Sequence, residues 1–183
     1  ERALHLMKHH KLQINVAAES QLTNNVAWAA FKLGDHERAL RHYEASARSC
    51  DAALRDGFNE CLNKVYDNLH ELVHRTLRRR GLAIDYLREG LASAKRAIDE
   101  RGLDEAALLH LDGNVRVRLG YLLVLHGELN EAENTLGPLL RHALTNTTGS
   151  SEHGLFTGPN VEKRALLQEA ATYVGWSRAF RRD

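Results

Sequence analysis

The segment at residues 32–40 has the pattern of one helix ending and another beginning, and it reads Lys32-Leu33-Gly34-Asp35-His36-Glu37-Arg38-Ala39-Leu40. Gly34 suits the left-handed backbone conformation that commonly follows the last residue of a helix. Beyond it, the small residue Ala39 and the large residue Tyr43 stand four positions apart, which places both on one face of a helix. The segment therefore predicts a tight turn between two helices.

Similar breaks recur along the chain, each marked by a glycine with charged or histidine neighbours. They occur at Gly34, Gly57, Gly81, Gly102 and Gly127. Between them apolar residues recur at helical spacing, and no convincing strand pattern is present. The predicted helices cover about 2–10, 12–33, 36–54, 58–79, 82–101, 104–126, 129–144 and 160–181. Because short turns force consecutive helices to run antiparallel, the sequence predicts an all-α chain of helical hairpins.

The composition agrees with a helical globular chain and excludes several classes of protein. The 183 residues include only 2 Pro and are 43% hydrophobic, which excludes disorder of the whole chain. The net charge is +1, whereas general nucleic-acid and membrane-surface binders rely on a basic field. There is no signal-peptide pattern and no run of about 18 apolar residues. We therefore expect a cytoplasmic protein with no membrane partner and little affinity for nucleic acid.

The two cysteines and the segment 145–160 each lead to a separate prediction. Cys50 and Cys61 are the only cysteines, and their apolar helical surroundings favour buried free thiols over a disulfide. Segment 145–160 is polar and rich in Gly, and loops of this length are usually functional or disordered. We expect a polar loop there, followed by Asn160 as the N-cap of the last helix.

The chain also contains an internal repeat. A small residue is followed four positions later by a large apolar one in three helices, at Ala39/Tyr43, Ala83/Leu87 and Ala132/Leu136. Ala3 and Met7 repeat this spacing near the start of the chain. The preceding helices match in part, at Val26-Ala27, Leu69-His70 and Leu119-Gly120. One hairpin cannot bury its apolar face alone, so repeated hairpins are expected to stack.

This pattern resembles the tetratricopeptide repeat, in which small residues lie where helix A and helix B approach closely. Residues 32–40 are similar to the turn and helix-B start of that family, and so is the segment Gly127-Glu128-Leu129-Asn130-Glu131-Ala132. Two features depart from the family: His70 replaces the small helix-A residue, and the repeats are longer than the usual length of about 34 residues. The long helices resemble the extended repeats of kinesin light chains, bacterial peptide-pheromone receptors and large bacterial regulators.

The resemblance implies a right-handed superhelix of antiparallel helical hairpins. A repeat array is expected at 1–144, with a partial first repeat and then repeats at about 18–54, 58–101 and 104–144. The polar loop at 145–160 and a C-terminal capping helix at 161–183 follow. Since the pattern begins within a helix B, we expect this chain to be a segment of a longer array.

A metal-site motif falls in the middle repeat. His70-Glu71-Leu72-Val73-His74 fits His-Glu-x-x-His, which on a helix places two imidazoles on one face where they could hold Zn, with Glu71 as general base. A third ligand is not evident, and Leu69, Leu72 and Val73 already form a packing stripe. We expect His70 to be a packing residue, His74 to lie in a groove and the chain to need no cofactor, while zinc hydrolysis stays open as an alternative.

The resemblance also implies a ligand site, because the family usually binds its ligand along helix A on the concave face. The corresponding positions here are Asn24, Asn25, Trp28, Lys32, Lys64, Asp67, Asn68, Glu71, His74, Arg75, Asn114, Arg118 and Tyr121. Asn25 and Asn68 occupy the same repeat position. Asn offers both a donor and an acceptor, so a ladder of Asn could bind an extended peptide backbone. The four cations among them could bind carboxylates. We expect a protein or peptide partner with acidic residues or a free C-terminus, and self-association stays open.

These observations predict a non-catalytic protein- or peptide-binding scaffold module of a larger protein. The alternative is the sensor arm of a multidomain bacterial signalling or transcription regulator, ordered by a peptide or other effector. Arg78-Arg79-Arg80 is interpreted as a solvated helix end, where cations suit the helix dipole, and not as a nucleic-acid contact.

Overall fold

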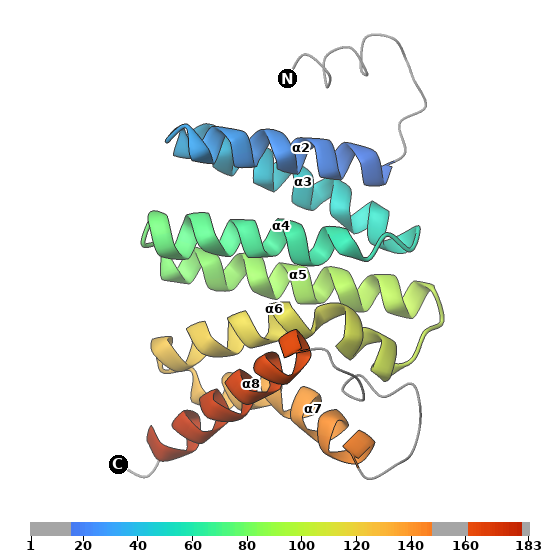
Figure 1. Ribbon diagram of the computed structural model, residues 1–183, viewed down its shortest axis with the longest axis vertical. Helices are drawn as coiled ribbons and strands as arrows, with labels where there is room; N and C mark the ends of the chain where they lie inside the picture. Colours follow the sequence, from blue (N-terminus) through green and yellow to red (C-terminus); the bar gives the residue numbers. More distant parts are fainter. Residues whose placement is uncertain (1–15, 148–160, 181–183) are drawn as a thin grey trace. The chain divides into compact units, whose positions relative to one another are not determined.

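The computed structural model describes residues 16–147 and 161–180, and every regular element within them is helical (Figure 1). The fold is therefore all-α, as predicted. The chain forms two compact units, one ending at Leu103 and the other beginning at Asp104. The predicted helix at 2–10, the N-cap Asn160 and the loop from residue 148 onward lie outside the described residues.

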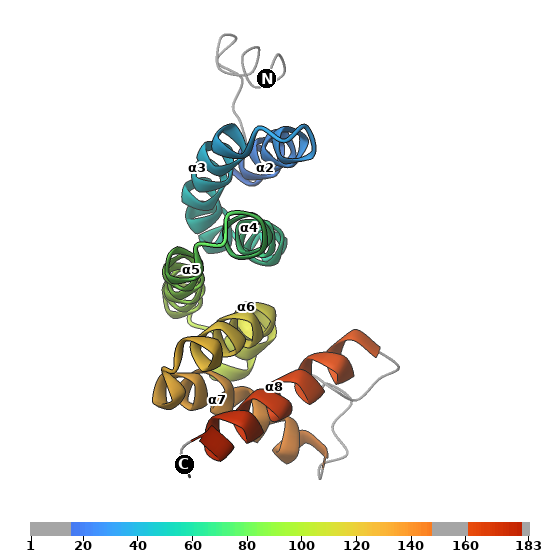
Figure 2. The same ribbon diagram turned by 90° about the vertical axis from the view of Figure 1, so that its left-hand side faces the viewer.

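The first unit consists of helices α2 (Val16–Lys32), α3 (His36–Arg55), α4 (Glu60–His70) and α5 (Arg80–Glu100), with a π-helical segment η1 (Glu71–Thr76) that continues α4. Each helix packs against the next, and α3 also contacts α5 while α2 contacts α4. Within this unit α2 and α4 form one layer and α3 and α5 the other (Figure 2). This is the arrangement expected of two successive helical hairpins.

Glycine ends most of these helices, as the sequence predicts, but one break differs. Gly34, Gly57, Gly102 and Gly127 all have positive φ, between 63° and 88°. The prediction for Gly81 is wrong, because α5 already begins at Arg80. The left-handed residue of that turn is Arg78, with φ of 58°. The basic run at 78–80 thus lies between η1 and α5, and Arg80 occupies the first turn of α5.

The repeated small and large residues form the core of both units. Ala39, Tyr43, Ala83 and Leu87 are all buried in the first unit, and Ala132 and Leu136 are buried in the second. Burial of a large apolar side chain such as Leu87 or Leu136 contributes about 1.5–3 kcal/mol. The packing role predicted for these positions is therefore confirmed.

Two buried serines hold α2 and α3 close together. Ser46 Oγ donates to the carbonyl oxygen of Ser20 at 2.7 Å, and Ser20 Oγ donates to the carbonyl oxygen of Ser46 at 3.1 Å. These reciprocal bonds satisfy both hydroxyls inside the core, where an unpaired polar group would be costly.

The second unit consists of α6 (Glu105–His126), α7 (Leu129–Thr147) and α8 (Val161–Phe180), and α8 packs against both other helices. Its core includes Val117, Leu136, Leu139, Ala170 and Val174. Asp104 caps α6 by accepting a hydrogen bond from the backbone N–H of Ala107 at 2.9 Å. Pro138 does not shorten α7, which continues past the predicted end at 144 to Thr147.

Gly120 on α6 packs against Leu136 on α7, and replacing Gly120 tests this packing. A Cβ at this position would lie 2.6 Å from Leu136 Cγ and Cδ1, and Leu136 is fully buried. We expect Gly120→Ala to lower the free energy of unfolding by about 1–3 kcal/mol through overpacking. Thermal and urea unfolding followed by circular dichroism measures the change.

Gly175 in α8 is the matched control, because a Cβ there would meet no atom within 4 Å. Gly175→Ala should stabilise the protein by about 0.5–1 kcal/mol through helix propensity alone. Equal effects of the two substitutions would contradict the close approach of α6 and α7.

Candidate functional site

The layer formed by α2 and α4 carries the predicted binding residues of the first unit. Asn68 Nδ2 donates to Asn24 Oδ1 at 3.0 Å, which joins the two helices through a pair of amides. Asn24 is buried and Asn68 half-buried, whereas Asn25 is exposed. The amide that pairs with Asn68 is thus that of Asn24, although the repeat alignment matches Asn68 to Asn25.

Trp28 is the large aromatic side chain beside this amide pair. It lies one helical turn after Asn24 on α2 and is 51% exposed. Lys32 places its ammonium group 5.3 Å from the centre of the Trp28 ring, in the range of a cation–π interaction. Lys32 has no carboxylate partner among the described residues. Trp28 and Lys32 thus offer an aromatic surface and a cation to a ligand.

The cations of α4 and η1 are already paired within their own helices. Lys64 Nζ lies 2.8 Å from Glu60 Oε2, and Arg75 Nη1 lies 3.0 Å from Glu71 Oε2. Such exposed pairs contribute only about 0.3–0.5 kcal/mol, so a ligand carboxylate could displace either partner. The predicted excess of positive charge on the α2 and α4 layer is therefore smaller than the sequence suggests.

The His-Glu-x-x-His motif spans the junction of α4 and η1. Its two imidazoles stack, with ring centres 5.2 Å apart and an interplanar angle of 29°. His70 is buried, as predicted for a packing residue, and His74 is half-buried. Burial, followed by the nearby charges of Arg80, Arg75 and Arg78, lowers the pKa of His74.

The structure brings no third metal ligand to this motif among the side chains that it describes, at 16–142 and 168–180. No group of three His, Cys, Asp or Glu side chains in these segments is placed to hold a metal ion. The motif falls where the backbone widens to a π-helix, a feature that often accompanies functional sites. Of the predicted binding residues, η1 contains Glu71, His74 and Arg75.

The predicted binding residues of the third repeat lie on α6, in the second unit. Asn114 is half-buried and Arg118 exposed. The half-buried ring of Tyr121 contacts Tyr173 of α8, with ring centres 5.1 Å apart. The chain's own last helix therefore covers part of the surface that was predicted to bind a ligand. This contact could not be foreseen from the repeat pattern, because α8 lies outside it.

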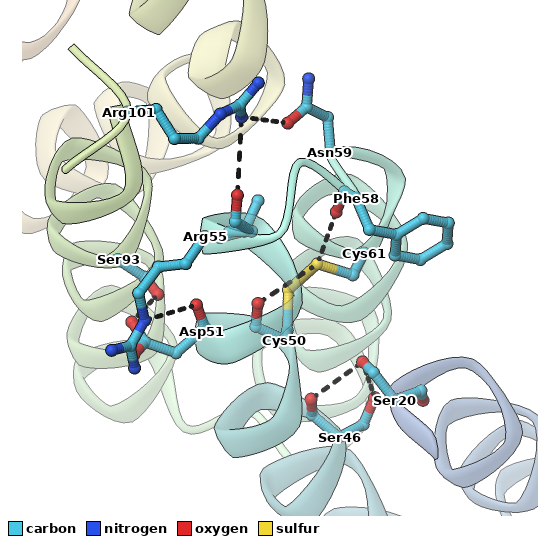
Figure 3. The surroundings of a disulfide bond; sticks show 11 residues. Ser20, Ser46, Cys50, Asp51, Arg55, Phe58, Asn59, Cys61, Ser93 and Arg101 are labelled. Atoms are coloured by element: carbon cyan, nitrogen blue, oxygen red, sulfur yellow. Dashed lines mark hydrogen bonds and ion pairs between the residues drawn. A yellow bond between two sulfur atoms is a disulfide. The ribbon is translucent and has the colours of Figure 1, made fainter. Parts of the chain in front are cut away.

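The prediction of two free thiols is wrong. Cys50 near the end of α3 and Cys61 at the start of α4 form a disulfide (Figure 3). The turn at Gly57 reverses the chain and brings their Cα atoms to 5.6 Å, within the usual range for a disulfide. Cys61 Sγ also lies 3.2 Å from the carbonyl oxygen of Phe58, an acceptor that its thiol would have after reduction.

A polar cavity lined by α3, α5 and Tyr66 of α4 was not predicted. Its volume is about 550 Å³, and its lining residues are Glu44, Ala47, Arg48, Asp51, Tyr66, Tyr86, Glu89, Ser93 and Arg96. Tyr86 donates to Glu44 and Ser93 donates to Asp51, each pair being 42 positions apart in the sequence. Contacts between residues so distant leave no signal in motif spacing.

Comparison with known proteins gives no match: no family model, no curated protein and no solved structure matches this chain. None of the described helices combines the length and the apolar character needed to cross a bilayer.

Proposed function

We propose that this chain is a non-catalytic recognition module that binds an extended protein segment or peptide on the α2 and α4 layer of its first unit. The half-exposed Trp28, with Lys32 above its ring and the Asn24–Asn68 pair beside it, carries the proposal. Tryptophan is strongly enriched at the centres of protein interfaces because it buries a large rigid surface.

The polar groups around Trp28 suit a peptide main chain. The amide of Asn68 is only half-buried, so its remaining donor and acceptor capacity is open to a ligand. An extended peptide presents alternating N–H and C=O groups along its length, which such amides can bind without reading side chains. Lys32 adds a preference for a carboxylate, from an acidic side chain or a free C-terminus.

The finer fold that we propose is a right-handed superhelix of the tetratricopeptide type. The two hairpins of the first unit support it, since α2 and α4 share one layer and α3 and α5 the other. In such an array the helix-A layer is the inner one and the predicted peptide face would be concave. A small-angle X-ray scattering profile of the full chain would distinguish an extended array from two independently tumbling units.

Peptide arrays provide the test of binding. The full chain is probed against acidic and neutral extended peptides, each with a free or an amidated C-terminus. We expect acidic and free C-terminal peptides to bind, and Trp28→Ala to weaken that binding about tenfold or more, as for an interface hot spot. Asn68→Ala and Arg75→Ala should weaken it less, because each removes a single polar contact.

Trp176 supplies the matched control, since it is another exposed tryptophan (44%) but belongs to α8 of the second unit. Trp176→Ala should leave the binding of peptides on the peptide array unchanged. If Trp28→Ala, Asn68→Ala and Arg75→Ala all retain every bound peptide, the α2 and α4 layer is not the binding face.

A further inference from the structure

The cavity between α3, α4 and α5 contains polar groups that could bind a ligand. Its lining residues belong to α3 and α5, with Tyr66 from α4. Its interior contains three carboxylates, two guanidinium groups, two tyrosines and one serine. The ligand that the cavity could bind depends on which of these groups are already paired.

One carboxylate and one guanidinium group are fully engaged with each other and their neighbours. Asp51 accepts from Ser93 Oγ, and also from Arg96 Nη2 and Arg55 Nη2 at 2.8 Å each. Burial would raise the pKa of Asp51, but the hydrogen bonds from Ser93 and Arg96 outweigh it and the pKa falls. Arg96 also donates to Glu89 Oε1 at 3.1 Å. Arg96 is thus bound between two carboxylates and offers little to an anionic ligand.

Two other carboxylates keep an oxygen available. Glu44 Oε1 accepts from the Tyr86 hydroxyl, and Glu89 Oε1 accepts from Arg96. Among the described residues, the second oxygen of each has no hydrogen-bond partner. A carboxylate has about four acceptor positions, so both groups can accept further N–H donors.

The hydroxyl of Tyr66 is the strongest indication of a ligand. Tyr66 is only 2% exposed, yet it lines the cavity and its hydroxyl has no hydrogen-bond partner within the described part of the chain. Its ring packs against Gly90, where a Cβ would lie 3.0 Å from the ring carbons, so the side chain is held in place. Because Tyr66 lines the cavity, a molecule within the cavity can supply the partner that a hydroxyl normally finds.

The chemistry of these groups selects the ligand. Two carboxylate oxygens and a tyrosine hydroxyl accept N–H donors, and two tyrosine rings favour a cation beside them. The second guanidinium group of the lining, Arg48, is exposed, and the three carboxylates outnumber the two guanidinium groups. No three acidic, histidine or cysteine side chains of the described residues are placed around a metal ion. The cavity of about 550 Å³ is large enough for a small organic molecule.

We propose that this cavity binds an organic cation, an ammonium or guanidinium group, held by Glu44, Glu89 and the hydroxyl of Tyr66. The cation belongs either to a small amine or guanidine or to a basic side chain of a partner protein. The carboxylates of this site come from the layer opposite the peptide face, because Glu44 lies on α3 and Glu89 on α5, whereas Tyr66 belongs to α4.

Isothermal titration calorimetry of the full chain tests this proposal with agmatine and spermidine as free cations, a blocked Arg-containing tripeptide, and glutarate and inorganic phosphate as anions. We expect saturable binding of the cations and none of the anions. Tighter binding of the tripeptide than of agmatine would identify a protein side chain as the source of the cation, and the reverse order would identify a small molecule.

Two conservative variants locate the site. Glu44→Gln keeps an acceptor for Tyr86 but removes the charge, and Tyr66→Phe removes only the hydroxyl. Because a hydrogen bond to a charged group contributes about 1.5–3 kcal/mol, each should weaken cation binding about tenfold or more. Circular dichroism melting of each variant verifies that the first unit is folded.

The matched controls change the same groups elsewhere on α3. Glu37→Gln neutralises an exposed carboxylate outside the cavity, and Tyr43→Phe removes a buried hydroxyl that has no hydrogen-bond partner in the described residues and does not line the cavity. Both should leave cation affinity within about twofold. Binding of anions in preference to cations, absence of cation binding, or equal affinity of Glu44→Gln and wild type would overturn the proposal.

Discussion

Replacing Asp112 by alanine should lower the free energy of unfolding of the second unit by about 3 kcal/mol, the lower end of the range for breaking a buried ion pair. The Asp112 side chain is fully buried, and its Oδ1 accepts from Arg116 Nε at 2.7 Å. Arg116 also reaches the carbonyl oxygen of Thr135 on α7 at 3.3 Å. Removal of the carboxylate leaves a largely buried guanidinium group without its counter-charge.

The asparagine variant separates the loss of an acceptor from the loss of a charge. Burial raises the pKa of Asp112 despite the hydrogen bond and charge of Arg116, so the carboxyl is harder to ionise in the folded state than in the unfolded chain. A raised folded-state pKa stabilises the protein fully below the ordinary carboxyl pKa of about 4, and this contribution is lost as the pH rises through the folded value.

We therefore expect Asp112→Asn, which keeps an acceptor for Arg116 but removes the counter-charge, to lower stability less than Asp112→Ala does at neutral pH. It should also remove the decrease in stability that Asp112 causes as the pH rises above about 4. Urea unfolding of wild type and both variants at several pH values measures these effects. A loss for Asp112→Asn as large as that for Asp112→Ala would show that the charge, and not the acceptor, holds α6 to α7.

Reduction of the disulfide should destabilise the first unit by about 3 kcal/mol. The bridge closes a short loop between Cys50 and Cys61, which are 11 positions apart, and the loss of chain entropy in the unfolded state gives this magnitude. Unfolding with and without a phosphine reductant measures the difference, and alkylation of unreduced protein followed by mass spectrometry counts free thiols.

The double variant Cys50→Ala, Cys61→Ala is the control for effects of the reductant itself, because it has no thiol to oxidise. Its stability should equal that of the reduced wild type within about 1 kcal/mol and should not respond to the reductant. Complete alkylation of both cysteines in unreduced, folded protein would contradict the disulfide. The disulfide also weakens the prediction of a cytoplasmic location, since thiols are kept reduced there.

Local patterns in the sequence predicted the helices well, because each depends on residues close together in the chain. The helix predicted at 36–54 is α3, His36–Arg55, and the helix predicted at 104–126 is α6, Glu105–His126. The Ala39/Tyr43 spacing identified core positions for the same reason, since residues four apart on a helix share a face.

The site was predicted less well because it depends on contacts between distant residues. The alignment matched Asn25 to Asn68, but Asn24 makes the hydrogen bond, and a shift of one residue turns a helical side chain by about 100°. The disulfide depends on the Cα–Cα distance across a turn, which spacing alone does not give. The charged cavity joins residues 42 positions apart.

The fluorescence of Trp28 tests the proposed peptide face most directly. The chain contains only two tryptophans, so Trp176→Phe leaves Trp28 as the sole reporter. An acidic peptide found to bind in the peptide-array experiment is titrated into this variant. Its binding should give a saturable change in Trp28 emission, because the ligand would cover the half-exposed ring. Unchanged emission from Trp28 while the same peptide alters Trp176 emission in Trp28→Phe would contradict binding on the α2 and α4 layer.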